Sequence, residues 1–117
     1  MGETRTYLGG RGNYQIVSAL GKRVLKRMVD LIEEEGWSKC GSLVTVWPDG
    51  MYCQALVRPK YKAGYKPLDN RPVMRIARER IEDLVEEVEW HLRKGWKVSG
   101  GVYKNYYGTL TQEIIKE

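Results

Sequence analysis

Long apolar runs are missing from this sequence of 117 residues. No stretch approaches the roughly 18 consecutive apolar residues that a helix needs to span a bilayer. The first residues, MGETRTYLGGRGNY, also lack the apolar centre of a secretory signal peptide. We therefore expect a cytoplasmic protein with no membrane partner. The length suits one domain with one core, and 42% hydrophobic and 30% charged residues are ordinary for a globular fold.

Cysteine and histidine are scarce, which restricts the chemistry that the chain can perform. The two cysteines, Cys40 and Cys53, flank the turn signal WPDG. Antiparallel pairing around that turn would place Cys40 nearer Val57 and Cys53 nearer Val44, so we expect buried free thiols and no disulfide. The one histidine, His91, is expected to pack as a neutral ring on its helix. Closely spaced zinc ligands, a nucleophile elbow and a phosphate-binding loop are all missing, so we predict no catalytic residue, no metal and no cofactor.

Positive charge is unevenly distributed along the chain, whose formal net charge is +5. Two segments are strongly basic, while the carboxylates concentrate in the predicted helices, in DLIEEE and EDLVEEVE. This segregation favours an anionic partner, although solubility alone would also account for it. In the first segment, residues 1–29, Glu3 is the only acidic residue beside Arg5, Arg11, Lys22, Arg23, Lys26 and Arg27. In the second, residues 58–80, Asp69 and Glu79 accompany Arg58, Lys60, Lys62, Lys66, Arg71, Arg75, Arg78 and Arg80.

The sequence repeats itself. GWSKCGSLVT, which begins at Gly36, has a counterpart in GWKVSGGVYK, which begins at Gly95, and the two copies are offset by 59 residues. The same offset aligns helix positions with 3.6-residue spacing, and an offset of 58 aligns the final strands. A match over helix, turn and hairpin indicates two copies of one folding unit. The aligned pairs are Leu25 with Leu84, Val29 with Val88, Gly41 with Gly100, Gln54 with Gln112, Leu56 with Ile114 and Val57 with Ile115.

Each copy is expected to form strand, helix, strand and strand. The first copy has these elements at Tyr14–Ala19, Lys22–Glu35, Ser38–Val46 and Met51–Arg58, and the second has them at Val73–Ala77, Arg80–Lys94, Lys97–Tyr103 and Tyr106–Lys116. We therefore predict an α+β fold in which two tandem β-α-β-β units form one largely antiparallel sheet with both helices on one face. The chain would be a single domain over 1–117, with repeats at 13–58 and 73–117 and a basic connection at 59–72.

The last strand of each copy predicts an unusual sheet surface. Alternation along Met51–Arg58 separates an apolar set, which contains Cys53 and Ala55 and suits the helix side, from a mixed set that contains Gln54 and Leu56. The mixed set recurs in the second copy, with a glutamine at the matching position. An exposed, half-apolar surface of this kind is typical of self-association or of a binding groove. We therefore predict a homo-oligomer.

Basic and aromatic residues occur together in three stretches, a combination that supplies phosphate contacts and flat surfaces for nucleotide bases. They are the connection RPKYKAGYKPLDNRP, the first segment with Arg5, Tyr7 and Arg11, and the second hairpin turn, VYKNYYG. Ordinary solvated loops would show similar residues. As ligand-binding candidates we select Arg58, Lys60, Arg75 and Arg78 for an anionic group, and Tyr103, Asn105 and Tyr106 for a ring.

YQIVSA before a helix, then EEGW, GSLV and YCQALVR, resemble a small domain of phage and bacterial proteins that has no assigned function. The likeness covers Tyr14 to Arg58 well and Val73 to Lys116 more loosely, since LTQEI replaces the Tyr-x-Gln-Ala ending. In size and in its basic-aromatic loops the chain is also similar to phage anti-defence sponges, those that inhibit Thoeris immunity by capturing a cyclic ADP-ribose isomer. That resemblance implies a phage protein in the host cytoplasm that sequesters a small anionic cyclic nucleotide at an oligomer interface, without catalysis. The alternatives are a nucleic-acid-binding protein and an accessory protein that inhibits a host factor.

Overall fold

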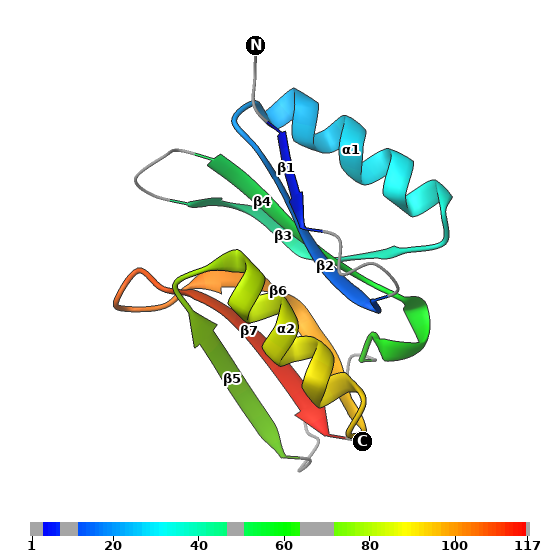
Figure 1. The fold of residues 1–117 in the computed structure, drawn as a ribbon, viewed down its shortest axis with the longest axis vertical. Helices are drawn as coiled ribbons and strands as arrows, with labels where there is room; N and C mark the ends of the chain where they lie inside the picture. The colour runs from blue at the N-terminus through cyan, green and yellow to red at the C-terminus, as the bar shows by residue number, and fades with distance from the viewer. Residues whose placement is uncertain (1–3, 8–11, 47–50, 64–71, 117) are drawn as a thin grey trace.

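The computed structural model describes residues 4–7, 12–46, 51–63 and 72–116 (Figure 1). Both predicted units are present, and the first has gained a short N-terminal strand, β1, which the sequence did not predict. The first unit contains β1 (Thr4–Tyr7), β2 (Tyr14–Ala19), α1 (Lys22–Glu34), β3 (Ser38–Val46) and β4 (Met51–Val57), followed by a 3-10 turn, η1 (Pro59–Tyr61). The second contains β5 (Val73–Arg78), α2 (Ile81–Leu92), β6 (Trp96–Lys104) and β7 (Leu110–Lys116).

The α+β class and the antiparallel pairing within each unit are confirmed, but the single sheet expected from the sequence is corrected to two. The first sheet has the strand order β1-β2-β4-β3, and the second has the order β5-β7-β6. In both sheets the strand after the helix carries a register shift, between Cys40 and Val44 in β3 and between Ser99 and Tyr103 in β6. Such a bulge interrupts the regular backbone ladder. β3 and β6 therefore meet at irregular edges, and no ladder joins them among the described residues.

β3 and β6 approach each other closely at two glycines, Gly41 and Gly101. A Cβ atom on Gly41 would lie 2.5 Å from the backbone nitrogen of Gly101, and one on Gly101 would lie 2.5 Å from the carbonyl oxygen of Cys40. Any side chain at these positions would separate the strands. Gly41, one of the two repeated glycines, and Gly101, the neighbour of the other, therefore allow the two units to come into contact.

The helices end as the sequence predicts. Gly36 and Gly95 both have φ of +98°, a left-handed conformation that costs glycine little. The tryptophan after each glycine folds back, so that Trp37 and Trp96 are partly buried against the core, as predicted. Each ring also lies under a cation from the end of its unit, Arg58 at 4.2 Å from the Trp37 centroid and Lys116 at 5.5 Å from that of Trp96.

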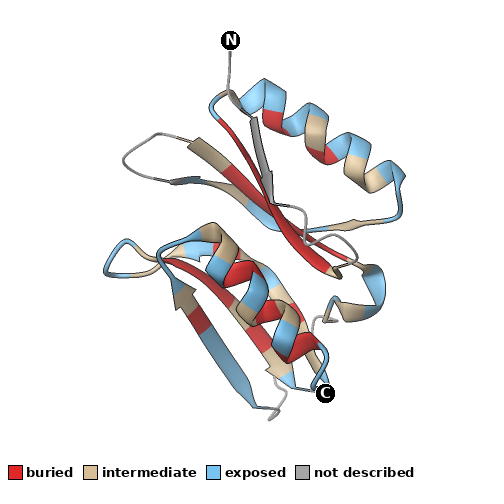
Figure 2. Cartoon of the chain, viewed as in Figure 1, coloured by how far each residue is buried: buried red, intermediate tan, exposed pale blue. Residues whose placement is uncertain are grey.

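The helices do not share one face of one sheet. β2 is buried along its length and β4 over most of it (Figure 2), and alternate residues of the two strands divide between two hydrophobic clusters. Val17 and Leu56 pack with α1, whereas Ile16 and Ala55 pack in a larger cluster that also holds Leu84, Val88 and Leu92 of α2. Because successive strand residues point to opposite faces, α1 and α2 cover opposite sides of the first sheet. α2 packs against the second sheet as well, through Ile76 and Ile114.

The prediction that the mixed set of β4 forms an exposed surface is wrong. Leu56 is fully buried, and Tyr52 packs against the cluster that contains Leu25 and Val29 of α1, so the mixed set faces α1. The set that contains Cys53 and Ala55 faces the core between the two units. The predicted homo-oligomer therefore loses the surface on which it was based, and it stays a prediction. The reason for the error is that both faces of this strand are covered, so that its alternation does not distinguish inside from outside.

The repeated glutamine stabilises the bulges. The Nε2 atom of Gln54 donates to the carbonyl oxygens of Cys40 and Gly41 at 2.9 and 3.1 Å, and the Nε2 atom of Gln112 donates to those of Ser99 and Gly100 at 3.3 and 3.0 Å. These carbonyls are displaced from the ladder by the register shift, so they need another donor. The buried hydroxyl of Tyr14 also donates to Oε1 of Gln112 at 2.7 Å, which joins the two units.

Candidate functional site

A groove of about 990 Å³ runs beside the outward side of α2. Its other wall comes from Gly12 and Asn13, just before β2, and from Arg78 at the end of β5. The groove therefore lies where the two units meet. Along α2 it is lined by residues with helical spacing, namely Asp83, Glu86, Glu87, Trp90 and Arg93.

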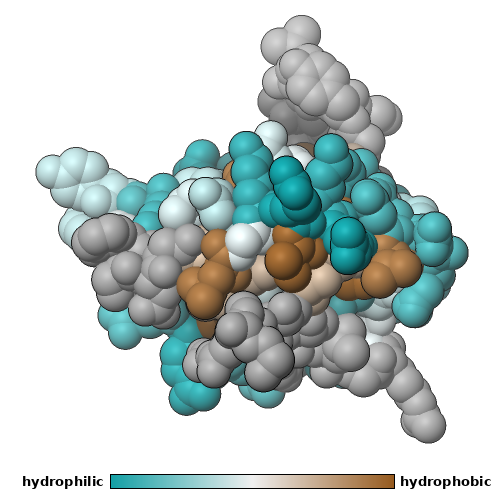
Figure 3. All heavy atoms as spheres, turned by 90° about the horizontal axis from the view of Figure 1, so that it is seen from above, coloured by the Kyte–Doolittle hydropathy of each residue, from teal (hydrophilic) through white to brown (hydrophobic). Residues whose placement is uncertain are grey.

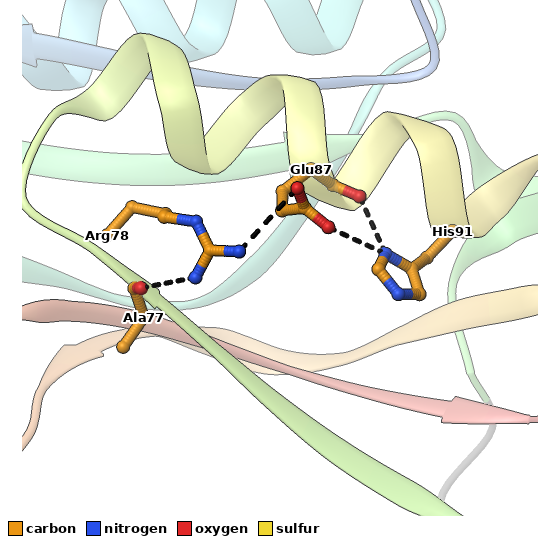
Figure 4. A network of polar contacts seen from close by, with 4 residues as sticks. All are labelled: Ala77, Arg78, Glu87 and His91. Atoms are coloured by element: carbon orange, nitrogen blue, oxygen red, sulfur yellow. Dashed lines mark hydrogen bonds and ion pairs between the residues drawn. The ribbon is translucent and has the colours of Figure 1, made fainter.

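Most of the carboxylates in the groove already have partners. Arg78 forms an ion pair with Glu87 at 3.5 Å and donates to the carbonyl oxygen of Ala77 at 2.7 Å (Figure 4). The backbone N–H groups of Asn13 and Tyr14 both donate to Oε1 of Glu89. Glu86 also has an interaction. The groove is therefore less anionic than its count of carboxylates suggests.

Trp90 and Arg93 are two groove side chains that remain available to contact a ligand. Trp90 is half exposed, and the Nζ atom of Lys94 lies 5.2 Å from its ring centroid. Arg93 is exposed and has no side-chain partner among the described residues. An indole face can stack on a planar ring, and a guanidinium can pair with two oxygens of a phosphate. The groove can therefore hold a ligand that carries both groups.

The histidine and the cysteines offer little reactivity. His91 is 9% exposed, and its Nδ1 atom lies 2.8 Å from the backbone oxygen of Glu87, so the prediction of a packed ring is confirmed (Figure 4). Both cysteines are free and buried, as predicted. Burial raises the pKa of Cys40 to about 12 and that of Cys53 to about 11, so both thiols are protonated at neutral pH.

The cysteine register differs slightly from the prediction. Cys53 pairs with Val44, as expected, but Cys40 pairs with Ala55 and not with Val57, because the bulge shifts the register.

In the part of the chain that the structure describes, no group of three His, Cys, Asp or Glu side chains could hold a metal ion. Neither described helix is long and apolar enough to cross a membrane.

The residues that the sequence proposed for an anion lie in separate places. Arg58 covers Trp37 and donates to the carbonyl oxygen of Glu35 at 3.4 Å, and the Nζ atom of Lys60 lies 5.1 Å from the Tyr61 centroid. Arg75 pairs with Glu113 at 3.3 Å on the second sheet. Arg78 is the one predicted residue that lines the groove.

The residues proposed for a ring lie together on the β6–β7 hairpin. Asn105 is occupied by the turn, because its Oδ1 atom accepts hydrogen bonds from the N–H groups of Tyr107 and Thr109, each at 2.9 Å. Tyr103 is 36% exposed and Tyr106 is 96% exposed. The Tyr106 ring contacts that of Tyr107 edge to face, with 5.4 Å between centroids. Arg78 of β5 is the strand partner of Leu110, which is the first residue of β7 after the hairpin turn. The hairpin turn and the groove therefore lie at the same end of the second sheet.

Sequence reasoning missed the groove, although part of the signal was present. Asp83, Glu86, Glu87, Trp90 and Arg93 follow a helical period, and a tryptophan on the polar side of an amphipathic helix is unusual. Asn13 gives no such signal, because only the fold brings it next to α2. Arg11, the turn at 47–50 and residues 64–71 of the basic connection lie outside the described residues.

Comparisons with protein-family models, with curated proteins and with solved structures find no match to this chain.

Proposed function

We propose that this chain is a non-enzymatic binding protein for a small phosphate-bearing nucleotide, and that the groove beside α2 is its binding site. One observation carries the proposal: a half-exposed indole, Trp90, and two guanidinium groups, Arg78 and Arg93, line one groove of about 990 Å³. A volume of this size is at the upper end of the range of ligand sites. Trp90 would stack on the base, and the arginines would pair with phosphate oxygens.

The carboxylates define which nucleotide would be accepted. A phosphate brought next to Arg78 would compete with Glu87 for the guanidinium, so the site would tolerate few phosphates and would disfavour a triphosphate. Asp83 has no side-chain partner among the described residues and could accept hydrogen bonds from a ribose hydroxyl or a base amino group. These features fit a compact nucleotide of low charge, the class to which cyclic signals belong.

Binding without catalysis is supported by the state of the reactive groups. A general base must reach the proton that it removes, but the Nδ1 atom of His91 contacts its own helix and the ring is mostly buried. The raised pKa values of Cys40 and Cys53 oppose a role as nucleophiles. The resemblance to anti-defence sponges adds the proposal that the bound nucleotide is an immune signal, held intact in a homo-oligomer.

Native mass spectrometry tests this function, since it reports assembly and ligand mass together. The protein would be incubated with cyclic ADP-ribose, cyclic di-AMP, ADP and ATP. We expect one bound and chemically unaltered cyclic nucleotide per groove, weaker binding of ATP, and an assembly larger than the monomer. A bound species of altered mass would indicate an enzyme, and no uptake of any probe would contradict the proposal.

A further inference from the structure

The charges of α1 oppose the dipole of the helix. Its first turns carry Lys22, Arg23, Lys26 and Arg27 with no acidic residue in the first turn, and its last turn has no basic residue. Helices are stabilised by the reverse arrangement, with carboxylates at the start and cations at the end. α1 therefore has a charge distribution that lowers its own stability.

α2 provides a control within the same molecule, because it is the second copy of the same unit. Its first turn contains Glu82 and Asp83, which is the stabilising arrangement for the start of a helix. The reversed pattern of α1 is therefore not a requirement of the β-α-β-β unit. This difference indicates that the cations of α1 have a role other than stabilising the helix.

Among the described residues, the four cations of α1 also lack counter-ions. Each is exposed, and none has a side-chain ion pair or hydrogen bond in the described part of the structure. Cations of the second unit are mostly engaged, as in the pairs Arg75–Glu113 and Arg80–Glu82. α1 thus concentrates the unpaired positive charge of the described residues on one element.

The spacing aligns these cations in two short rows. Lys22 and Lys26 are one turn apart, as are Arg23 and Arg27; the arginine row lies opposite the buried Leu25, and the lysine row lies along the side of the helix. Figure 3 looks down on the side of the molecule that carries α1 and shows hydrophilic side chains massed beside a smaller hydrophobic patch. The exposed apolar residues of this region are Leu20, Val24 and Leu31.

We propose that this outer face of α1, defined by Lys22, Arg23, Lys26 and Arg27, binds the phosphate backbone of a nucleic acid. Rows of unpaired cations one helical turn apart suit a regular polyanion, and a helix fixed to a sheet presents them in a constant geometry. A membrane surface fits less well, because an interfacial helix inserts its main apolar face. In α1 that face, which contains Leu25 and Val29, is buried against the first sheet. This surface is separate from the groove and does not depend on the proposed function.

The test is fluorescence anisotropy with a labelled duplex of about 30 base pairs and mixed sequence, measured over a series of salt concentrations. Four phosphate contacts predict that log K falls against log salt with a slope of roughly −3 to −4. Arg23→Glu should weaken binding roughly tenfold or more and reduce the slope by about one. Lys39→Glu is the matched control, since Lys39 is exposed and lies outside α1, and the charge change is the same.

Folding and binding effects can be separated in the same variants. Arg23→Glu places a carboxylate in the first turn of α1, so its urea midpoint should rise or stay unchanged while its DNA affinity falls. Trp90→Ala should keep its DNA affinity, which distinguishes this surface from the groove. Equal losses in Arg23→Glu and Lys39→Glu would overturn the proposal, since they would reflect net charge alone. Binding to phosphatidylserine vesicles without binding to DNA would also overturn it.

Discussion

Two glutamines show how single residues stabilise this fold. Gln54 and Gln112 occupy the same position in the two copies, and each donates from Nε2 to carbonyl groups that a bulge has displaced. Gln112 has one further role, because its Oε1 atom accepts the hydrogen bond of the buried Tyr14 hydroxyl. The two positions therefore form a natural pair of variants, in which the difference between them measures the contact between units.

We predict that Gln112→Leu destabilises the protein more than Gln54→Leu does. Each change leaves bulge carbonyls without their donor, at a cost of about 1–3 kcal/mol. Gln112→Leu also leaves the fully buried Tyr14 hydroxyl unpaired, which should add about 1 kcal/mol. Urea unfolding measures both values, and repeating the pair in a Tyr14→Phe background should remove the difference. If the two variants lose equal stability when Tyr14 is present, the hydrogen bond between Tyr14 and Gln112 does not contribute to stability.

The buried thiols predict a loss of stability in alkali. Burial raises the pKa of Cys53 to about 11 and that of Cys40 to about 12, from an ordinary value of 9.0. A group whose pKa is raised on folding contributes stability that is full below its unfolded pKa and is lost as the pH rises towards its folded pKa. The free energy of unfolding should therefore fall between pH 9 and pH 11, by on the order of 1–2 kcal/mol for each thiol.

The measurement is urea unfolding at pH 8 and at pH 10.5. The Cys40→Ala/Cys53→Ala variant is the comparison, and it should lose less stability over this interval than the wild type. Both proteins should carry Tyr14→Phe, because burial and, to a smaller extent, Cys40 raise the pKa of Tyr14, and its contribution would otherwise differ between them. The same loss in both proteins would contradict the assignment to the thiols.

Among the helices and strands, β3 and β6 bring the two units into close backbone contact. Gly100 and Gly41 are equivalent in the repeat and have φ of +69° and +63°, but their surroundings differ. A Cβ atom on Gly100 would meet nothing within 4 Å, whereas one on Gly101 would lie 2.5 Å from a carbonyl oxygen of β3. Gly100 is therefore needed for its left-handed backbone conformation, and Gly101 is needed because β3 lies too close for a side chain.

Alanine substitutions should separate these purposes. Gly100→Ala should cost about 1–2 kcal/mol, the penalty of a left-handed residue with a side chain. Gly101→Ala should cost about 3 kcal/mol or more, because backbone and not a flexible side chain would have to move. Chemical unfolding of both variants measures the difference. Similar values for the two would show that β3 and β6 do not need this close approach.

The sequence predicted the elements well because their signals are local. The helix period and the glycine after each helix located α1 and α2, and both depend on residues close together in the chain; the repeat supported the same assignment in each copy. The face assignment of β4 failed for a reason that is not local. Both faces of that strand are covered, one by α1 and the other by the second unit, and no pattern within β4 records which partner lies on which side.

At the scale of the whole molecule, α2 holds the two units together and forms the groove at their junction. One side of this helix packs against both sheets, and its outward side presents Trp90 and Arg93. Residues far apart in the sequence, such as Asn13 and Arg78, complete the groove. This is why the seven residues selected from the sequence did not define it: the choice followed basic and aromatic loops, and the groove depends on tertiary contacts.

Isothermal titration with cyclic ADP-ribose and cyclic di-AMP measures whether the groove beside α2 binds a nucleotide through Trp90. Three proteins would be compared: the wild type, Trp90→Ala, and the control Tyr107→Ala, which removes an exposed aromatic ring outside the groove. We predict that the wild type and Tyr107→Ala bind at least one probe equally, and that Trp90→Ala binds it roughly tenfold more weakly or worse, since the stacked base is lost. Unchanged affinity in Trp90→Ala, or no binding of either probe to the wild type, would contradict the claim.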